Sequence, residues 1–256
     1  MEENNTGIPA VLWVPGGDRE AAGTLARQLG TALLENADPG ALFLRFDADG
    51  LTLSDGEREM RGDFRRLVPR LKRENLGGEL LVRAAKLKAV EHPSVLDATA
   101  GMGEDSLLLA AAGCTVTLYE RDPVIAALLA DTLRRAREDD ALRAVAARMT
   151  LYAEDSIAAL TRLADAPESE RPDVVLLDPM FPERQKSALV KKKFQLLHRL
   201  EAPCGEEASL LDAARAAAKY RVIVKRPAKG AYLADVKPSY SLAGKAVRYD
   251  CLLPTS

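Results

Sequence analysis

The stretch Val95-Leu96-Asp97-Ala98-Thr99-Ala100-Gly101-Met102-Gly103-Glu104-Asp105 decides the fold of this 256-residue chain. Its apolar start predicts a buried strand, and its glycines predict a loop that lets a ligand approach the backbone closely. Its acidic end predicts the first turn of a helix. A strand, a glycine loop and a helix in this order are typical of an α/β domain that binds a nucleotide-like ligand.

The acids of this loop indicate which ligand it binds. A dinucleotide loop would have a third glycine where this chain has Ser106, and a helix start free of negative charge. Carboxylates here would repel a pyrophosphate and attract a cation, and S-adenosylmethionine (SAM) carries both an ammonium and a sulfonium group. We therefore expect SAM to bind at Asp97, Gly101, Gly103, Glu104 and Asp105.

Downstream of this stretch, short β-rich runs alternate with amphipathic helical segments. This alternation predicts a doubly wound α/β domain, in which helices cover both faces of a mostly parallel sheet. The predicted strands are 94–98, 115–120, 149–153, 173–178 and 220–225, and the predicted helices are 105–112, 123–139, 156–163 and 206–219. Two β-like stretches, 232–236 and 246–253, would complete the sheet as an antiparallel hairpin.

The N-terminal part of the chain differs in character and predicts a small α/β module over residues 1–75, before the larger domain over 76–256. It has a strand pattern at 11–14, a helix pattern at 18–34 and a hairpin pattern made by 41–46 and 51–53. The turn Gly16-Gly17-Asp18 lacks the Lys-Ser/Thr pair of a phosphate loop, so it predicts a plain strand-to-helix turn.

Composition narrows the class of protein. The hydrophobic content of 47% supports a large core, and neither a membrane span nor a signal peptide is visible, so we expect a cytoplasmic location without membrane partners. Three widely spaced cysteines without a CxxC motif suggest neither a disulfide framework nor a zinc site, and we expect no metal.

Charge is unevenly distributed along the chain. The net charge of −2 argues against a protein that coats nucleic acid, so an RNA partner must meet a local basic patch. Residues 58–88 form one such patch, with ten basic residues against four acidic ones. This patch is as compatible with a solvated surface as with a phosphate contact.

Acids also close the strands that follow the first one. Glu120 ends the second strand, where an acid receives ribose hydroxyls in these folds. Asp155 follows the third and could accept from an adenine amino group, with Ser156 beside it, or could serve only as a helix N-cap. Asp178 ends the fourth. Because ligands bind at the carboxyl ends of parallel strands, we expect these acids to share one site.

The tetrapeptide Asp178-Pro179-Met180-Phe181 places a carboxylate, a rigid proline and an aromatic ring directly after a buried strand. This arrangement suits a flat heterocycle with an exocyclic amino group. We expect Asp178 and the carbonyl of Pro179 to accept the N–H bonds of the amine and Phe181 to stack on the base. The alternative is that Asp178 caps a turn and Phe181 fills the core.

Basic residues flank this predicted catalytic loop. Lys186, Lys191 and Lys192 follow it in a segment that also holds Arg184 and Lys193, and Lys225 and Arg226 end the fifth strand on the same edge. A charge run is usually only a solvated face. Their position beside the loop makes Lys186, Lys191, Lys192, Lys225 and Arg226 our candidate RNA-binding residues.

These motifs together resemble the class I SAM-dependent methyltransferases. Within that class, Asp97-Ala-Thr-Ala-Gly-Met-Gly103, Glu120-Arg121-Asp122-Pro123 and the stretch from Asp178 to Lys193 are similar to the bacterial 16S rRNA guanine-N2 methyltransferase J family. The similarity runs from about residue 77 to 250. It implies SAM as cofactor, 16S rRNA or the small ribosomal subunit as partner, and methyl transfer to N2 of a guanosine near the 3′ end. It also implies cofactor contacts at Glu104-Asp105, Glu120-Arg121, Asp155-Ser156 and Asp178.

Other functions remain open on the residues alone. An amino-methyltransferase for another RNA or DNA base would share the cofactor and chemistry, although no motif here resembles a helix-turn-helix or zinc finger. A non-catalytic nucleotide-binding protein would keep the fold and lose the site acids, whereas this chain has Asp97, Glu120 and Asp178. An NAD-dependent oxidoreductase is disfavoured by Ser106 and the acidic loop. The sequence leaves the oligomeric state open.

Overall fold

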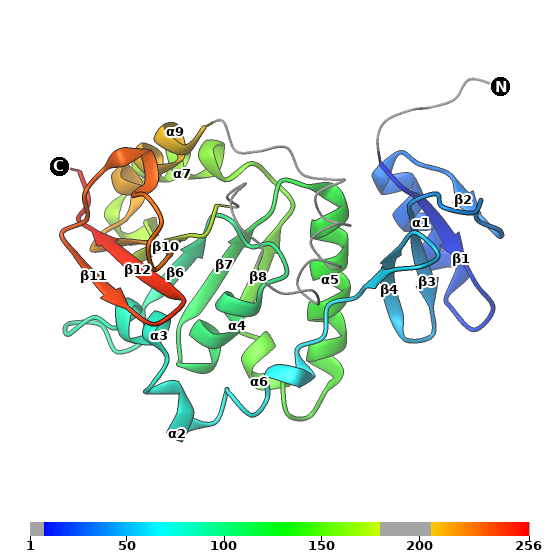
Figure 1. The fold of residues 1–256 in the computed structure, drawn as a ribbon, viewed down its shortest axis with the longest axis horizontal. Helices are drawn as coiled ribbons and strands as arrows, with labels where there is room; N and C mark the ends of the chain where they lie inside the picture. Colours follow the sequence, from blue (N-terminus) through cyan, green and yellow to red (C-terminus); the bar gives the residue numbers. More distant parts are fainter. Residues whose placement is uncertain (1–7, 180–205, 256) are drawn as a thin grey trace. The chain divides into compact units, whose positions relative to one another are not determined.

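The computed structural model describes residues 8–179 and 206–255. Within these ranges the chain forms two compact units, the first made of residues 8–63 and 122–135, and the second of 64–121, 136–179 and 206–255. Each unit contains its own sheet (Figure 1). Among the described helices, none has the length and apolarity to cross a membrane. The division predicted at residue 75 stays a prediction.

The first unit contains a five-stranded sheet in the order β2-β1-β3-β4-β5. Strands β1 and β3 are parallel, and β3 and β4 form the predicted antiparallel hairpin. The bounds are β1 Ala10–Trp13, α1 Arg19–Leu29, β2 Leu33–Leu34, β3 Phe43–Asp47, β4 Gly50–Ser54 and β5 Glu59–Met60. The Asp18 side chain accepts from Ala21 N at 3.0 Å and caps α1, which confirms the plain turn before it.

The predicted helix over 18–34 is too long. Gly30 adopts a left-handed φ of +64°, and its N–H bonds to the last carbonyls of α1, so the helix ends there. Leu33 and Leu34 instead pair in parallel with β1 as the edge strand β2. Their apolar character fitted either element, and pairing with β1 decided between them.

The second unit contains a seven-stranded sheet in the order β11-β12-β10-β9-β6-β7-β8. The five strands from β10 to β8 are parallel, whereas β12 runs antiparallel to β10 and forms a hairpin with β11. The bounds are β6 Ser94–Asp97, β7 Thr115–Tyr119, β8 Met149–Tyr152, β9 Val174–Leu177, β10 Arg221–Pro227, β11 Tyr240–Ala243 and β12 Val247–Leu252. This confirms the doubly wound α/β fold. The strand order reverses between β6 and β9, where such sheets bind ligands.

Helices connect these strands close to the predicted ranges. Pro123 occupies the first position of α5, where its missing N–H costs nothing, and Gly113 with φ +103° follows α4. The bounds are α4 Glu104–Ala111, α5 Pro123–Glu138, α6 Arg143–Ala146, α7 Ser156–Ala164 and α9 Glu207–Ala217. Before them lie α2 Arg73–Leu76 and α3 Leu80–Ala85, and the short 3-10 turns are η1 Arg65–Leu67, η2 Glu168–Glu170 and η3 Leu233–Asp235.

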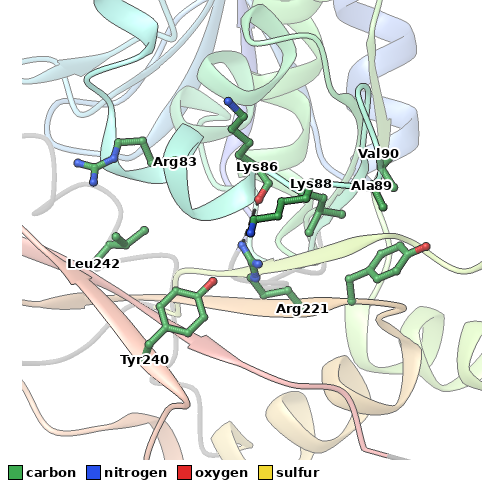
Figure 2. Close-up of a pocket in the computed structure, with 10 residues that line it drawn as sticks. Arg83, Lys86, Lys88, Ala89, Val90, Arg221, Tyr240 and Leu242 are labelled. Carbon is green, nitrogen blue, oxygen red and sulfur yellow. Dashed lines mark hydrogen bonds between the residues drawn. The ribbon is translucent and has the colours of Figure 1, made fainter.

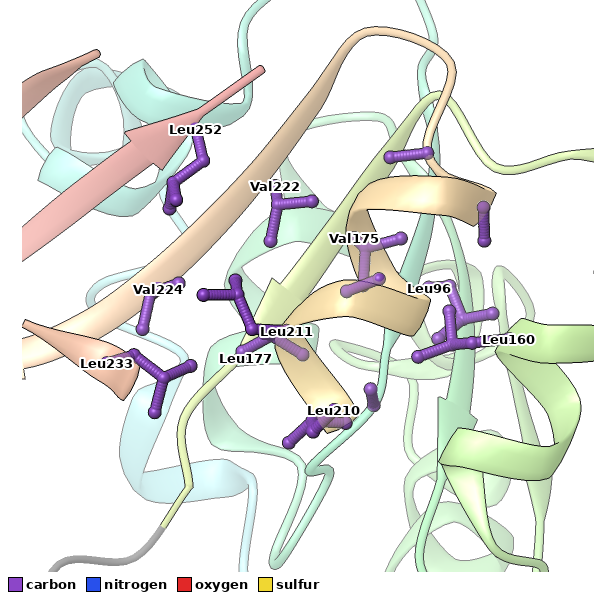
Figure 3. Packing of buried hydrophobic residues seen from close by; sticks show 14 of the residues in the cluster. Leu96, Leu160, Val175, Leu177, Leu210, Leu211, Val222, Val224, Leu233 and Leu252 are labelled. Carbon is purple, nitrogen blue, oxygen red and sulfur yellow. The ribbon is translucent and has the colours of Figure 1, made fainter. Parts of the chain in front are cut away.

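One hydrophobic core of the second unit lies between α7, α9 and the central strands (Figure 3). Alternate residues of β9 point to this face, so Val175 and Leu177 pack with Leu211 of α9, and Leu160 of α7 belongs to the same cluster. All four residues of β9 are fully buried. Each such side chain contributes about 1.5–3 kcal/mol, so β9 is a rigid base for the residues that follow it.

The strand predicted at 232–236 is wrong. This segment forms the 3-10 turn η3, in which Ala234 and Asp235 have positive φ values of 49° and 57°. Only Leu233 of this segment is fully buried, and the adjacent Ala234 is partly buried too, so the segment lacks the alternating burial of a strand. The hairpin partner of β12 is β11, which begins at Tyr240.

Candidate active site

The glycine loop between β6 and α4 is held open by two left-handed residues. Gly101 has φ +52°, and Gly103 has φ +73° at the N-cap of α4. The N–H of Gly101 donates to Glu120 Oε2 at 2.9 Å, which ties the loop to the end of β7. Apart from its chain neighbours, no described residue would lie within 4 Å of a Cβ added at Gly101, so this side of the loop leaves room for a ligand.

Asp97 lies under this loop and is almost fully buried. Its Oδ2 accepts from Ser106 Oγ at 2.6 Å and its Oδ1 from Thr99 N at 3.1 Å. Burial raises the pKa of Asp97 to about 7, against the opposing effect of these two hydrogen bonds. Near neutral pH the carboxyl group of Asp97 is therefore present in both its neutral and its charged form.

Lys225 of β10 joins two of the predicted site acids. Its Nζ lies 2.7 Å from Asp105 Oδ2 and 2.9 Å from Asp178 Oδ2. These residues come from β10, from the first turn of α4 and from the end of β9, and the parallel register brings them together. Lys225 was predicted to bind substrate, and the structure shows it between a cofactor candidate and the catalytic candidate.

Withdrawal from water raises the pKa of Asp178, and the attraction of Lys225 opposes this. The pKa of Lys225 is raised by Asp178 and Asp105, although its own burial acts in the other direction. Tyr249 of β12 pairs with Lys225 in the strand register, and burial raises its pKa too. The cluster therefore holds an ammonium between carboxylates beside a neutral phenol.

The backbone of Asp178 is fixed by the glycine loop. Its N–H donates to Thr99 Oγ1 at 2.6 Å, and the following Pro179 is buried. The side chain of Asp178 keeps 41% of its surface exposed, so a substrate can reach it although the protein atoms packed around it raise its pKa. The sequence reasoning missed Thr99 and used Ser106 only to exclude a dinucleotide. Thr99 stands within the conspicuous stretch 95–105 and Ser106 directly follows it, and a hydroxyl near an acid was the signal available.

The remaining predicted cofactor residues lie at the same edge but make other contacts. Glu104 forms an ion pair with Arg66, and Arg121 reaches Glu206 at 3.4 Å. Asp155 Oδ1 accepts from Ala158 N at 3.0 Å and caps α7, of which Ser156 is the first residue. Oδ1 of Asp155 therefore caps the helix, as the alternative prediction stated. A role for its other oxygen stays a prediction.

Of the predicted RNA-binding residues, the structure describes Arg226 and Lys225. Arg226 is buried and donates from Nε to the carbonyl of Ala231 at 2.7 Å, so it supports the loop after β10. Lys225 belongs to the carboxylate cluster described above. Lys186, Lys191 and Lys192 lie outside the described residues, and so does Phe181, the predicted stacking ring.

The carboxylates of this site fit a cationic ligand. Asp97, Asp105 and Glu120 line one loop whose backbone is open at Gly101. Carboxylates at these positions can accept from an ammonium and from ribose hydroxyls. Within residues 8–179 and 206–255, no group of three His, Cys, Asp or Glu residues is arranged to hold a metal ion.

Comparison with known proteins agrees with this geometry. The family described as "Putative SAM-dependent methyltransferase" matches residues 27–254. The chain is 45% identical over 238 residues to ribosomal RNA small subunit methyltransferase J of Thioalkalivibrio sulfidiphilus, covering 91% of this chain and 92% of that protein. It is 41% identical to the protein of the same name from Neisseria meningitidis, covering 83% and 84%.

A solved structure shows the same architecture. The crystal structure of a SAM-dependent methyltransferase from Neisseria gonorrhoeae is 34% identical, covers 95% of both chains and superposes with a TM-score of 0.77. The family match over residues 27–254 includes the glycine loop, the strand-end acids and every strand of the seven-stranded sheet. The chain therefore belongs to the ribosomal RNA small subunit methyltransferase J family of SAM-dependent methyltransferases.

Proposed function

We propose that this protein transfers a methyl group from SAM to the exocyclic N2 of a guanosine near the 3′ end of 16S rRNA. The names of the relatives support the RNA of the small ribosomal subunit as substrate. The choice of guanine N2 rests on the sequence resemblance around Asp178. The observation that carries the chemistry is the position of Asp178, fixed by Thr99 and Lys225 beside the acidic loop.

We assign the cofactor to the carboxyl ends of β6 and β7. Asp97 and Asp105 would accept from the ammonium group, and Glu120 from the ribose hydroxyls. Gly101 and Gly103 would let the ligand lie against the backbone. When bound, SAM supplies an electrophilic methyl group on its sulfonium. Glu104, Arg121, Asp155 and Ser156 would flank it at the same edge.

The lone pair of guanine N2 is delocalised into the ring, so the amine is a weak nucleophile. In our proposal, Oδ1 of Asp178 and the carbonyl of Pro179 accept its two N–H bonds and orient the lone pair for in-line attack. Lys225 engages Oδ2 of Asp178 and keeps the carboxylate charged and in place. Alignment and preorganised charge, rather than prior proton removal, then supply most of the rate. As the bond from N2 to the methyl carbon forms, the bond from that carbon to sulfur would break and S-adenosylhomocysteine would leave. The proton that methylated N2 then loses would pass to the carboxylate of Asp178.

The target base must leave its stack to reach this position. Phe181 would stack on it, and Lys186, Lys191 and Lys192 would contact the neighbouring phosphates. These assignments rest on the sequence, where all four follow Asp178 closely. A basic segment beside the catalytic residue would also make RNA binding sensitive to salt.

The test is incubation of the protein with labelled SAM and small ribosomal subunits that lack the modification, followed by nucleoside mass spectrometry. We expect N2-methylguanosine in the 16S rRNA. Methylation of another base would show that the chemistry is right and the target wrong, and no methylated nucleoside would refute the proposal.

The catalytic assignment is tested separately with Asp178→Ala. We expect a loss of at least about 100-fold in kcat, because a preorganised acceptor at the reacting atom contributes this order of magnitude. Affinity for S-adenosylhomocysteine should change much less. Full activity in this variant would remove Asp178 from the mechanism.

A further inference from the structure

The structure divides the basic patch of residues 58–88 into two parts. Arg61 pairs with Asp47, Arg65 with Asp139 and Arg70 with Glu79, so these cations are neutralised within their own unit. Arg66 is likewise paired with Glu104. In contrast, no carboxylate among the described residues lies within ion-pair distance of Arg83, Lys86 or Lys88.

These three cations line a pocket of about 500 Å³ in the second unit (Figure 2). The wall is completed by Arg221 of β10 and by two tyrosines, Tyr220 before β10 and Tyr240 at the start of β11. All charged side chains of the pocket are therefore positive. In a chain with a net charge of −2, four cationic residues that line one pocket favour an anionic ligand.

Arg221 is held in place by the protein itself. Its Nη1 donates to the carbonyl of Ala84, and its guanidinium lies 5.5 Å from the centre of the Tyr240 ring. Figure 2 shows Arg221 between Tyr240 and the segment that carries Lys86 and Lys88. The guanidinium is thus already ordered, and little conformational entropy is lost when it binds an anion.

The tyrosines give the pocket a second property. Tyr220 and Tyr240 each expose 43% of their surface, and both are among the few large apolar residues that the described part of the chain leaves exposed. Exposed rings beside cations are typical of surfaces that stack nucleic-acid bases and hold the adjoining phosphates. A small inorganic anion would use the cations and leave the rings without a role.

The pocket is distinct from the active site. Arg221 and Lys225 point to the same face of the sheet but lie four residues apart on β10, about 13 Å at roughly 3.3 Å per residue. Lys225 belongs to the edge where parallel strands end, whereas Arg221 pairs with Val174 at the start of β9. The pocket therefore lies at the opposite edge from the acids.

We propose that this pocket binds a segment of single-stranded RNA, with phosphates on Arg83, Lys86, Lys88 and Arg221 and a base against Tyr220. The inference rests on the proposed function, since it adds a second anchoring point for the same RNA substrate. Single-stranded RNA fits because its bases are free to stack, whereas the bases of a duplex are already stacked on one another.

The experiment measures binding of a short fluorescent single-stranded RNA to the full chain by anisotropy at several salt concentrations. The variants are Lys86→Gln, Lys88→Gln and Tyr220→Ala. The control is Arg143→Gln, which removes an equally exposed cation from α6 in the same unit. Inorganic triphosphate serves as a competitor that carries charge without bases.

We expect each lysine variant to lower the salt slope of log Kd by about 0.7 in magnitude, the value for one phosphate contact on a single strand. Tyr220→Ala should weaken binding by roughly fivefold or more at an unchanged salt slope. Arg143→Gln should match the wild type. Equal RNA affinity and salt slope in the wild type and the lysine variants would overturn the proposal, as would loss of triphosphate binding without loss of RNA binding.

Failure of the proposed function gives a different result. In that case the wild-type protein would form no N2-methylguanosine in small subunits, whatever its affinity for RNA. If the wild type methylates the subunits and the pocket variants bind RNA as it does, only the pocket assignment fails.

Discussion

Lys225 has the most consequential contacts of any single residue in the active site. It lies between Asp105 and Asp178, which the sequence assigned to the cofactor and to the substrate amine. An ammonium in this position screens two carboxylates from each other. It therefore links the two halves of the site and acts as a positioning residue for Asp178.

Replacing this residue tests that role. In Lys225→Met the pKa of Asp178 should rise further, because an attraction that lowers it is lost. We expect kcat to fall roughly tenfold, or about 1.4 kcal/mol, and the acid limb of the pH profile of kcat to move to higher pH. Steady-state kinetics across the pH range give both quantities.

The control for this variant is Lys219→Met, which breaks a similar pair with Asp173. That pair lies just before β10 and β9 begin, at the opposite edge from the site. It should cost stability and leave the pH profile of kcat in place. If the two variants shifted the profile equally, the role of Lys225 would be only structural.

Asp97 makes a prediction about pH. Burial raises its pKa to about 7, so between the unfolded value near 3.9 and pH 7 the folded protein binds a proton that the unfolded chain has released. The stability due to this group is present at low pH and is lost as pH rises through that window. Ionised Asp97 is also the form that attracts an ammonium.

We therefore expect S-adenosylhomocysteine to bind roughly tenfold more tightly at about pH 8 than at about pH 6, since the ionised fraction of a group with this pKa changes by that factor. Isothermal titration calorimetry measures the affinity and the proton released. Asp97→Asn should abolish the pH dependence. A pH-independent affinity in the wild type would contradict the assignment of Asp97 to the ammonium.

At the scale of elements, the start of α7 illustrates two roles for one side chain. Asp155 Oδ1 caps the helix through Ala158 N, yet Asp155 follows a parallel strand at the ligand-binding edge. Helix capping requires only a short side chain with an acceptor oxygen. The cofactor role requires an acceptor that also reaches into the site, so the two can be separated by substitution.

Asp155→Ala should lower the free energy of unfolding by about 1 kcal/mol through loss of the cap. Asp155→Ser should restore most of this stability, because Ser is a good N-cap residue. If Asp155 also binds the adenine, both variants should lose affinity for S-adenosylhomocysteine. Denaturant unfolding and calorimetry measure the two effects.

Asp18→Ala is the matched control, since Asp18 caps α1 of the first unit in the same way through Ala21 N. It should cost similar stability at no cost in affinity. If Asp155→Ser bound the ligand like the wild type, Asp155 would be a cap alone.

Most elements were predictable, and the errors have a common cause. Four of the five parallel strands, β6, β7, β9 and β10, are completely or largely buried, so their apolar runs stood out in the sequence. In the edge strand β8 only Met149 is buried. The errors fell on Leu33-Leu34 and on 232–236, which are short and peripheral. The pairing of Leu33-Leu34 with β1 and the burial of Leu233 decided the structure of these segments, and neither leaves a periodic pattern in the sequence.

At the scale of the whole molecule, the first unit is not one continuous segment. Besides residues 8–63 it includes 122–135 of α5, where the buried carboxylate of Asp131 accepts from Leu51 N at 3.0 Å and from Arg135 Nε at 2.8 Å. The Nη2 of Arg135 in turn donates to the carbonyl of Gly62. The N-terminal sheet therefore depends on a helix that the chain supplies much later.

Asp131→Ala should destabilise the protein by about 2–3 kcal/mol, since it leaves the buried N–H of Leu51 unsatisfied and removes the partner of a guanidinium. Urea unfolding measures the change. The control Asp140→Ala removes an exposed carboxylate paired with Arg143, and its effect should stay below about 0.5 kcal/mol. Equal effects in the two variants would show that the contact with Leu51 contributes nothing.

The sequence by itself determined the doubly wound fold, the acidic glycine loop and the acids at the strand ends. These features depend on local apolar runs and on short-range motifs, which a chain displays directly. Only the tertiary structure decided that Lys225 bridges Asp105 and Asp178. It also decided that four arginines of the basic patch are neutralised, whereas Arg83, Lys86 and Lys88 line a pocket with Arg221 and two tyrosines. The contacts of Lys225 with Asp105 and of Arg221 with Ala84 join residues more than a hundred positions apart. Strand register, which no local pattern encodes, sets which of these residues meet.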